Sequence, residues 1–319
     1  MSEAILGIDV SKKKLDVALI FDAMTLKKKF DNTPKGFKLI GGWLMSLHIE
    51  RVHACLESTG TYGEAVAEFL HEKGHRVSVV NPFRIKAYAN TDLKRNKTDP
   101  ADAYLIADFC RVKKPDEWHP LPPEVKHLQA LTRRIEALDQ MLNAEKNRLE
   151  VAPPKVRPSV KRIIRTLETE IRNIQRVIKE HIDDNPDMKE QNDLLLTIPG
   201  IGQTTSQLLL GEVDFRRFDS ARAVAAQAGL TPRKDQSGTS LNRTRLSKVG
   251  NARIRKALYF PALTALKYNQ TIKQFASRLS QKGKVPMEVI CAAMRKLLHI
   301  AFGVLKNKTP FVPNLAHSI

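Results

Sequence analysis

Short apolar runs separated by polar turns predict an α/β domain over residues 1–118. Strands are expected at 5–10, 15–21, 51–57 and 76–80, the first two joined by a Lys-rich turn, and helices at 63–73 and 99–112. Strands mixed with helices, opening in a hairpin, are typical of the α/β class.

The middle of the chain, residues 119–188, carries a heptad-like apolar stripe. The stripe consists of Leu128, Leu131, Ile135, Leu138, Leu142 and Leu149 and resumes after a proline-rich segment with Val160, Ile164, Leu167, Ile171, Ile174, Ile178 and Ile182. Charged residues fill the other faces, so the pattern predicts two long helices. It fits a bundle core within the chain and a dimerising coiled coil equally well.

Residues 189–319 are predicted to form a mostly α-helical domain. It opens with TIPGIG at 197–202, a hydrophobic–x–Gly–hydrophobic–Gly pattern typical of a helix-hairpin-helix turn. In such a turn Gly200 and Gly202 let backbone amides approach a phosphate at a helix N-terminus, without sequence specificity. The alternative is a tight turn that only joins two helices.

Composition adds a strong positive charge. The 319 residues include 53 Lys and Arg against 34 Asp and Glu, a net charge of +19. An excess of that size repels itself and indicates a polyanionic partner, most often nucleic acid. The basic residues run along the whole chain instead of lining one amphipathic helix, which argues against a membrane surface.

Other composition features indicate a reduced, cytoplasmic protein without a membrane span. The three cysteines, Cys55, Cys110 and Cys291, form no C-x-x-C pair, which excludes a disulfide framework and a zinc ribbon. The N-terminus lacks the pattern of a signal peptide. The apolar segment 285–305 contains Arg295 and Lys296 near its centre, so a packed helix is expected there.

Four carboxylates predict a metal site. Asp9 lies inside an apolar strand, where an ionised carboxylate is costly unless it is paired or binds metal, and Glu57 ends a second strand. Asp99 and Asp102 flank Pro100 in KTDPADA, at the first turn of a helix. Such oxygen ligands hold two Mg²⁺ ions about 3.5–4 Å apart in phosphodiester chemistry. The alternative for Asp99 and Asp102 is helix capping, which is compatible with metal binding.

The charge is densest at 231–260, where the basic residues are Arg233, Lys234, Arg243, Arg245, Lys248, Arg253, Arg255 and Lys256 and the one acid is Asp235. A Ser-Gly pair in this polar loop has two interpretations. One is a solvated phosphate-binding face; the other makes Ser237 a nucleophile that attacks a DNA phosphorus, with guanidinium groups neutralising the developing charge. Ser240 and Ser247 are rival hydroxyls, and no histidine nearby is an obvious base.

These residues predict a metal-dependent nucleic-acid enzyme and leave its reaction open. One competitor is a nuclease or Holliday-junction resolvase of RuvC type, which hydrolyses phosphodiesters with water and does not need Ser237. A second is a non-catalytic scaffold that binds RNA or DNA, in which the four acids are caps and core ion pairs.

Several segments together resemble the DEDD transposases of the IS110 family of bacterial insertion sequences, whose members act as bridge-RNA-guided recombinases. The segments are GIDVSKKKLDVAL, CLESTGTYGE, NPFRIKAYA with NKTDPADA, IPGIG, and GLTPRKDQSGTS with RLSKVGNARIRKALY. The resemblance covers essentially the whole chain. It implies a RuvC-like N-terminal domain of the ribonuclease H fold.

The resemblance also implies roles for particular residues. The four acids of the family fall on Asp9, Glu57, Asp99 and Asp102, and the serine of its (Q/E)SG motif falls on Ser237. It implies an enzyme that cuts and rejoins donor and target double-stranded DNA with Mg²⁺, guided by a structured noncoding RNA. The acids of one protomer would act with the serine of another, so a homo-oligomer is expected in the bacterial nucleoid, held by the helical middle.

Overall fold

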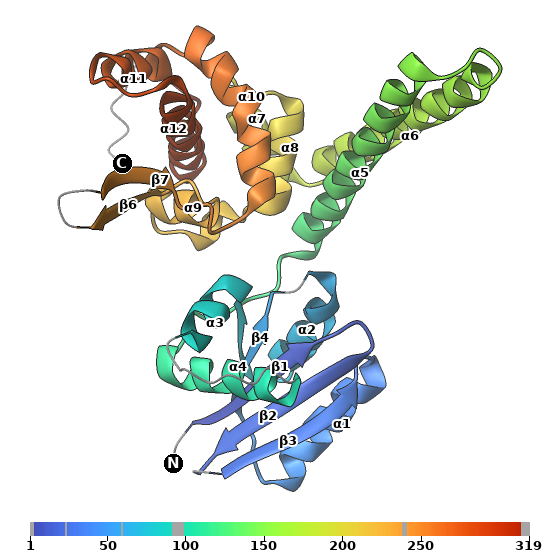
Figure 1. The fold of residues 1–319 in the computed structure, drawn as a ribbon, viewed down its shortest axis with the longest axis vertical. Helices are drawn as coiled ribbons and strands as arrows, with labels where there is room; N and C mark the ends of the chain where they lie inside the picture. The colour runs from blue at the N-terminus through green and yellow to red at the C-terminus, as the bar shows by residue number, and fades with distance from the viewer. Residues whose placement is uncertain (1–2, 23, 59, 91–98, 238–240, 314–319) are drawn as a thin grey trace. The chain divides into compact units, whose positions relative to one another are not determined.

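The computed structural model describes residues 3–313 except 23, 59, 91–98 and 238–240, with the backbone alone described at 99–101, 234–237 and 241–244. The chain divides into two compact units, Met1–Pro120 and Leu121–Ile319. Figure 1 shows a sheet with helices in the first unit and mainly helices in the second.

The first unit is built on a five-stranded mixed sheet with the order β3-β2-β1-β4-β5. The strands are β1 (Ala4–Val10), β2 (Lys14–Phe21), β3 (Met24–Asp31), β4 (Val52–Glu57) and β5 (Arg76–Val80). The first three pair antiparallel, β4 is parallel to β1, and β5 is parallel to β4. The α/β prediction and its four strands are therefore confirmed.

The strand β3 was not predicted from the sequence, and the reason is physical. It lies at the edge of the sheet and all its residues are exposed except Phe30, so apolar and polar positions do not alternate along it. The run Lys27, Lys28 and Lys29 suits such an edge, because charged side chains oppose pairing with another strand.

Helices cover both faces of this sheet. One face packs against α1 (Pro34–Ser46) and α2 (Glu64–Glu72), and the other packs against α3 (Pro82–Ala89) and α4 (Asp99–Lys113). The short 3₁₀ helix Thr61–Gly63 precedes α2. The helices α2 and α4 agree with the prediction, whereas α1 and α3 were not predicted.

The helix α4 lies directly on β1 at Gly7. A Cβ atom on Gly7 would lie 2.2 Å from the carbonyl oxygen of Ala103 and 2.4 Å from the amide nitrogen of Ala107. Both contacts are with helix backbone, which cannot move aside as a flexible side chain can. Any residue other than glycine at this position would push α4 away from the sheet.

We therefore expect Gly7→Ala to lower the free energy of unfolding of the first unit by at least about 1–3 kcal/mol, the usual cost of overpacking a core. Urea denaturation of the full chain measures this. Gly41→Ala in α1 is the matched control, because a Cβ there meets nothing within 4 Å and alanine favours the helix by up to about 1 kcal/mol. Equal effects of the two substitutions would contradict the account.

The second unit begins with two long helices, α5 (Pro123–Val151) and α6 (Arg157–Asp183), which form a hairpin. The predicted apolar stripe is buried between them, where Leu138 and Leu142 of α5 cluster with Val160, Ile164 and Ile171 of α6. The two predicted helices are thus present, and the stripe packs within the chain. Self-association through this hairpin stays a prediction.

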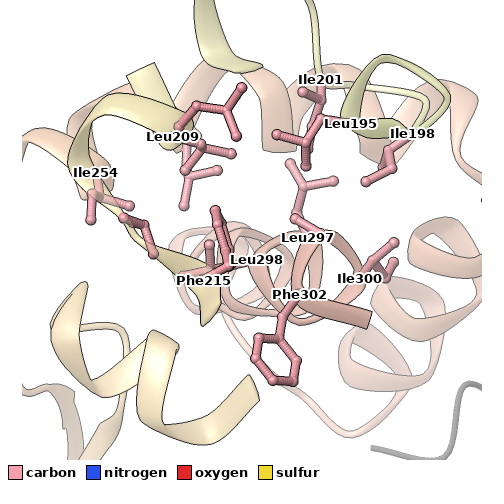
Figure 2. Close-up of a cluster of buried hydrophobic side chains, with 14 of the residues drawn as sticks. Leu195, Ile198, Ile201, Leu209, Phe215, Ile254, Leu297, Leu298, Ile300 and Phe302 are labelled. Carbon is pink, nitrogen blue, oxygen red and sulfur yellow. The ribbon is translucent and has the colours of Figure 1, made fainter. Parts of the chain in front are cut away.

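The rest of the second unit surrounds α12 (Pro286–Asn307). It contains α7 (Pro186–Leu196), α8 (Gln203–Glu212), the 3₁₀ helix Phe215–Arg217, α9 (Ala221–Gln227), β6 (Pro232–Ser237), β7 (Leu241–Leu246), α10 (Ala252–Tyr268) and α11 (Gln270–Gln281). Figure 2 shows Leu297, Leu298 and Phe302 of α12 among side chains from these helices. The apolar segment 285–305, predicted to be a packed helix, forms most of α12, so that prediction is confirmed. Across the described residues, none of the helices has both the length and the apolar character needed to span a membrane.

One buried titratable group in this core is His299 of α12, which is 9% exposed. Its Nε2 atom has no hydrogen-bond partner among the described residues. Burial, together with the charges of Arg295, Lys296 and Arg222, lowers the pKa of His299 from 6.5 to about 4. The imidazole is therefore neutral in the folded protein at neutral pH.

Because the pKa is lower in the folded than in the unfolded state, His299 supports folding fully above about pH 6.5 and loses this contribution as the pH falls towards 4. We expect the unfolding free energy of the second unit to fall over this range by up to about 3 kcal/mol through this residue. Chemical denaturation at several pH values should show a smaller loss in His299→Leu. An unchanged pH dependence in that variant would contradict the assignment.

Candidate carboxylate site and serine hairpin

Two predicted acids lie side by side at one edge of the sheet. The last register pair between the parallel strands β1 and β4 is Ile8 with Leu56, and Asp9 and Glu57 each follow by one residue. Neighbouring strands are about 4.8 Å apart. Both side chains are half-buried. The carboxyl ends of the two central parallel strands therefore bring these acids together.

Both acids are on the face of the sheet that α4 covers. Gly7 pairs with Cys55 in the register, and residues two apart along a strand share a face, so Asp9 and Glu57 are on the face of Gly7 and Cys55. Cys55 clusters with Ala103 of α4, as expected for that face.

The first turn of α4 lies at the same edge. Ala103 lies over Gly7, whereas Cys110, about two turns further along the helix, interacts electrostatically with His53 of β4 and with Glu3, which precedes β1. The helix therefore runs towards the amino ends of β1 and β4. Its start is at their carboxyl ends, and it includes Asp102, which is half-buried.

The structure thus brings Asp9, Glu57 and Asp102 to one edge of the sheet. Asp99 is the first residue of α4, three positions before Asp102, and its side chain lies outside the described residues. The floor beneath the acids is apolar, formed by Cys55, Ala103, Ile106 and Ala107 among others. The hydrogen bond with Cys110 and burial raise the pKa of the Cys55 thiol, so this thiol is a neutral part of that floor.

A further carboxylate, Asp16, lies beside these acids and was not predicted from the sequence to belong to the site. It is the register partner of Asp9 across β1 and β2, and it forms an ion pair with Lys29 of β3, Oδ1 to Nζ 2.8 Å. Like charges directly opposite one another destabilise a sheet, and the ammonium of Lys29 offsets this repulsion. The sequence pattern that could have identified it is the alternation of Leu15, Asp16 and Val17. This alternation puts Asp16 on the opposite face of the sheet from the buried Leu15 and Val17.

The chemistry of this donor set fits hard divalent cations. Half-buried carboxylate oxygens from separate elements are the ligands that Mg²⁺ prefers, and the fixed backbone around Gly7 holds them in place. Imidazole and thiolate ligands, which select softer metals, are not part of the set.

The serine candidate lies in the second unit, on a β-hairpin. The sequence predicts a polar loop at Ser237, and this prediction is wrong for the backbone, because Ser237 is the last residue of β6 and pairs with Leu241 of β7. Arg233 pairs with Arg245 nearer the base of the hairpin. Ladder hydrogen bonds between two strands stabilise such a segment even when its side chains are polar.

Two other basic residues predicted to bind nucleic acid, Lys234 and Arg243, lie on the same hairpin. Lys234 pairs with Thr244 and Arg243 pairs with Asp235 in the register, and the side chains of these four residues lie outside the described part of the chain. Ser240 also lies outside it. Ser247 follows β7, and its Oγ accepts a hydrogen bond from the amide of Val249 at 3.4 Å.

Charged side chains hold the segment that follows the hairpin. Glu212 is buried and accepts hydrogen bonds from Arg133 at 2.9 Å and from the side chain of Asn251 at 2.8 Å. Asn251 in turn caps the N-terminus of α10. Arg253, predicted to bind nucleic acid, donates to Glu136 at 2.7 Å. These ion pairs connect the start of α10 to α5.

The TIPGIG turn joins α7 to α8. Gly200 has a φ of 109°, and a Cβ there would lie 2.8 Å from both the Cβ of Ala265 and the carbonyl oxygen of Pro261 in α10. Packing therefore accounts for this glycine. Gly202 is exposed at the N-terminus of α8 and has open space around its Cα. Contact of either glycine with a phosphate stays a prediction.

Comparison with known proteins places the chain in a family. Residues 6–152 match the family model DEDD_Tnp_IS110, described as a transposase, and residues 192–277 match the model of the IS116/IS110/IS902 transposase family. The pilin gene-inverting protein of Moraxella bovis is 34% identical over 316 residues, which is 98% of each chain. The chain belongs to the IS110 family of transposases, as the resemblance predicted.

Two other proteins are similar to this chain over part of it. The transposase for insertion sequence element IS1328 of Yersinia enterocolitica is 27% identical over 77% of this chain and 81% of its own length. Among solved structures, T. thermophilus RuvC in complex with a Holliday junction substrate matches 37% of this chain and 100% of its own chain, at 14% identity and a TM-score of 0.28. The assignment of the first unit to the RuvC-like fold stays a prediction.

If the acids at the sheet edge bind Mg²⁺, then Mg²⁺ should raise the unfolding temperature of the wild type, by mass action. Asp9→Asn should lose most of this gain while keeping or increasing its stability without metal, because it removes one of several neighbouring negative charges. Thermal unfolding with and without Mg²⁺ measures both quantities.

Asp22→Asn is the matched control for this substitution. Asp22 is exposed in the turn between β2 and β3 with a φ of 44°, a conformation that asparagine tolerates. The control should respond to Mg²⁺ as the wild type does. An equal response of Asp9→Asn and Asp22→Asn would rule out a metal site that includes Asp9.

Proposed function

We propose that this chain is a Mg²⁺-dependent DNA transposase or recombinase that cuts and rejoins strands of an insertion sequence. The observation that carries the proposal is the meeting of Asp9, Glu57 and the first turn of α4 at one edge of the sheet. Membership of the IS110 family supports it, and so does the net charge of +19.

In this proposal Asp9, Glu57, Asp99 and Asp102 hold Mg²⁺, two ions per site. When bound, the ions activate the attacking oxygen and stabilise the leaving oxygen of a phosphodiester. The protein keeps the carboxylates in place through the backbone contact of α4 with β1. The apolar floor beneath them keeps water away from the side of the carboxylates that faces the domain core.

We assign the nucleophile to Ser237. Its Oγ attacks a DNA phosphorus, an Oγ–P bond forms, and the bond from phosphorus to one deoxyribose oxygen breaks. The serine proton leaves and the departing oxygen takes up a proton. In rejoining, a deoxyribose hydroxyl of another strand attacks the same phosphorus and releases the serine. The energy of the cut bond is kept in the phosphoserine ester, so no other energy source is needed.

Basic side chains of the hairpin and its surroundings suit the binding of DNA and RNA phosphates. Arg233, Arg245 and Lys248 are exposed, and Lys248 has a φ of 56° in the turn after β7. We assign phosphate contacts to them and to Lys234 and Arg243, with Gly200 and Gly202 as a second contact. Arg253 is assigned a weaker role because Glu136 already pairs with it.

The partners in this proposal are donor and target double-stranded DNA, a structured noncoding bridge RNA that selects both by base pairing, and further copies of the chain. Delegating sequence choice to RNA agrees with a surface rich in backbone-binding charge. The place of action is the bacterial cytoplasm, at the nucleoid. A protein that inverts a gene and one that moves an element both cut and rejoin DNA, so both named relatives are compatible with this chemistry.

The test is a denaturing gel of protein incubated with Mg²⁺, its co-purified RNA and labelled DNA that spans the junction of the element. We expect the wild type to give a slow-migrating, protease-sensitive covalent band and Ser237→Ala to give none. Asp9→Asn should also give none, while its affinity for DNA stays close to that of the wild type.

Ser240→Ala and Ser247→Ala serve as controls, because they remove the rival hydroxyls of the same segment. Both should keep the covalent band, and its loss in either alone would move the nucleophile there. Free cut ends of equal intensity in the wild type and in Ser237→Ala would identify water as the nucleophile and support a resolvase. Equal loss of DNA binding and cleavage in Asp9→Asn would contradict the metal site.

A further inference from the structure

The segment that leaves the first unit, residues 114–120, is held firmly along β5. The amide of Trp118 donates to the carbonyl of Val77 at 2.6 Å, and the hydroxyl of Ser78 donates to the carbonyl of Asp116 at 2.8 Å. These bonds fix the backbone on both sides of Glu117. The indole of Trp118 also packs against the core between the sheet and α2.

Three metal-binding side chains meet at this segment. Glu117 and His119 come from it, and His71 comes from the last turn of α2. Their ligand atoms all lie within 4.8 Å of one another, and the rings of His71 and His119 are 5.4 Å apart, edge to face. His71 is half-buried, and the other two are exposed. Small rotamer changes would bring the three ligand atoms to coordination distance of one ion.

We propose that His71, Glu117 and His119 form a binding site for Zn²⁺. Two imidazole nitrogens and one carboxylate oxygen are a common zinc ligand set and leave a fourth position for water. The hydrogen bonds of Trp118 and Asp116 fix the backbone that carries Glu117 and His119 before the ion arrives, which lowers the entropy cost of binding.

This site is separate from the carboxylate site in chemistry and in place. Mg²⁺ prefers oxygen ligands, whereas nitrogen ligands favour zinc and related ions. The helix α2 packs on the face of the sheet that carries Leu6, Ile8 and Leu56, and the carboxylates are on the face covered by α4. The zinc site therefore does not depend on the proposed function.

The consequence of binding is structural. A bound ion would tie the end of α2 to the segment that ends at Pro120, immediately before the second unit begins. It would resist any movement in which this segment peels away from β5. Zinc would thus stiffen the connection where it leaves the first unit.

The experiment uses the untagged full chain with Mg²⁺ present, so that the carboxylates do not compete for the probe ion. A calorimetric titration with Zn²⁺ should show one ion bound per chain. Metal analysis of the protein after dialysis should give the same ratio. Trp118 provides an optical signal, since its ring lies 6.3 Å from that of His71 and Trp43→Phe removes the other tryptophan.

Loss of an outer-shell partner of a metal ligand already weakens binding about 10–100-fold, so His71→Ala, Glu117→Gln and His119→Ala should each weaken it at least that much. Thermal unfolding without zinc shows whether each variant is folded. Two controls should bind as the wild type does. They are His48→Asn, exposed with a φ of 56°, and His127→Ala, which alters the histidine pair His127–His181 of the second unit.

The proposal is overturned if folded His71→Ala and His119→Ala bind zinc as tightly as the wild type. It is also overturned if His127→Ala loses the ion, because the site is then in the second unit, or if the wild type binds none. Catalytic failure of the Ser237→Ala variant has no bearing on these outcomes, so the two proposals fail separately.

Discussion

The contact between the backbone of α4 and β1 at Gly7 is the constraint on which the carboxylate site depends. No side chain fits between them, so the helix lies as close to the strand as backbone allows. The first turn of α4 is thereby held at the edge where Asp9 and Glu57 end their strands. A residue with no chemistry of its own thus sets the spacing of residues that have it.

Some basic residues of this protein form ion pairs that stabilise the fold, and others are exposed to solvent. The net charge of +19 does not show which residues belong to which group. In the second unit Glu212 and Glu136 hold Arg133 and Arg253 in partly buried ion pairs, which order the start of α10. Breaking such a pair is costly because it leaves an unpaired charge. The cations that remain exposed around the hairpin, among them Arg245, are the ones with solvent access for phosphate.

The carboxylate edge shows how a sheet tolerates a concentration of negative charge. Asp9 and Asp16 are opposite one another in the register, and Lys29 on the next strand pairs with Asp16. In this row across β1, β2 and β3, the positive charge of Lys29 therefore neutralises one of the two negative charges. A divalent cation near Asp9 would complete this balance on the other side.

The sequence by itself determined the strands β1, β2, β4 and β5, the helices α2, α4, α5 and α6, and the acids at the strand ends, because apolar periodicity is local and strong in these segments. Only the tertiary structure decided that Asp16 faces Asp9, that the polar segment around Ser237 is a hairpin, that the stripe of α5 and α6 packs within the chain, and that β3 completes the sheet. These features depend on register and on contacts between residues far apart in sequence. Strands rich in polar residues, such as β3, β6 and β7, are held by backbone hydrogen bonds, which leave no apolar pattern in the residues that make them.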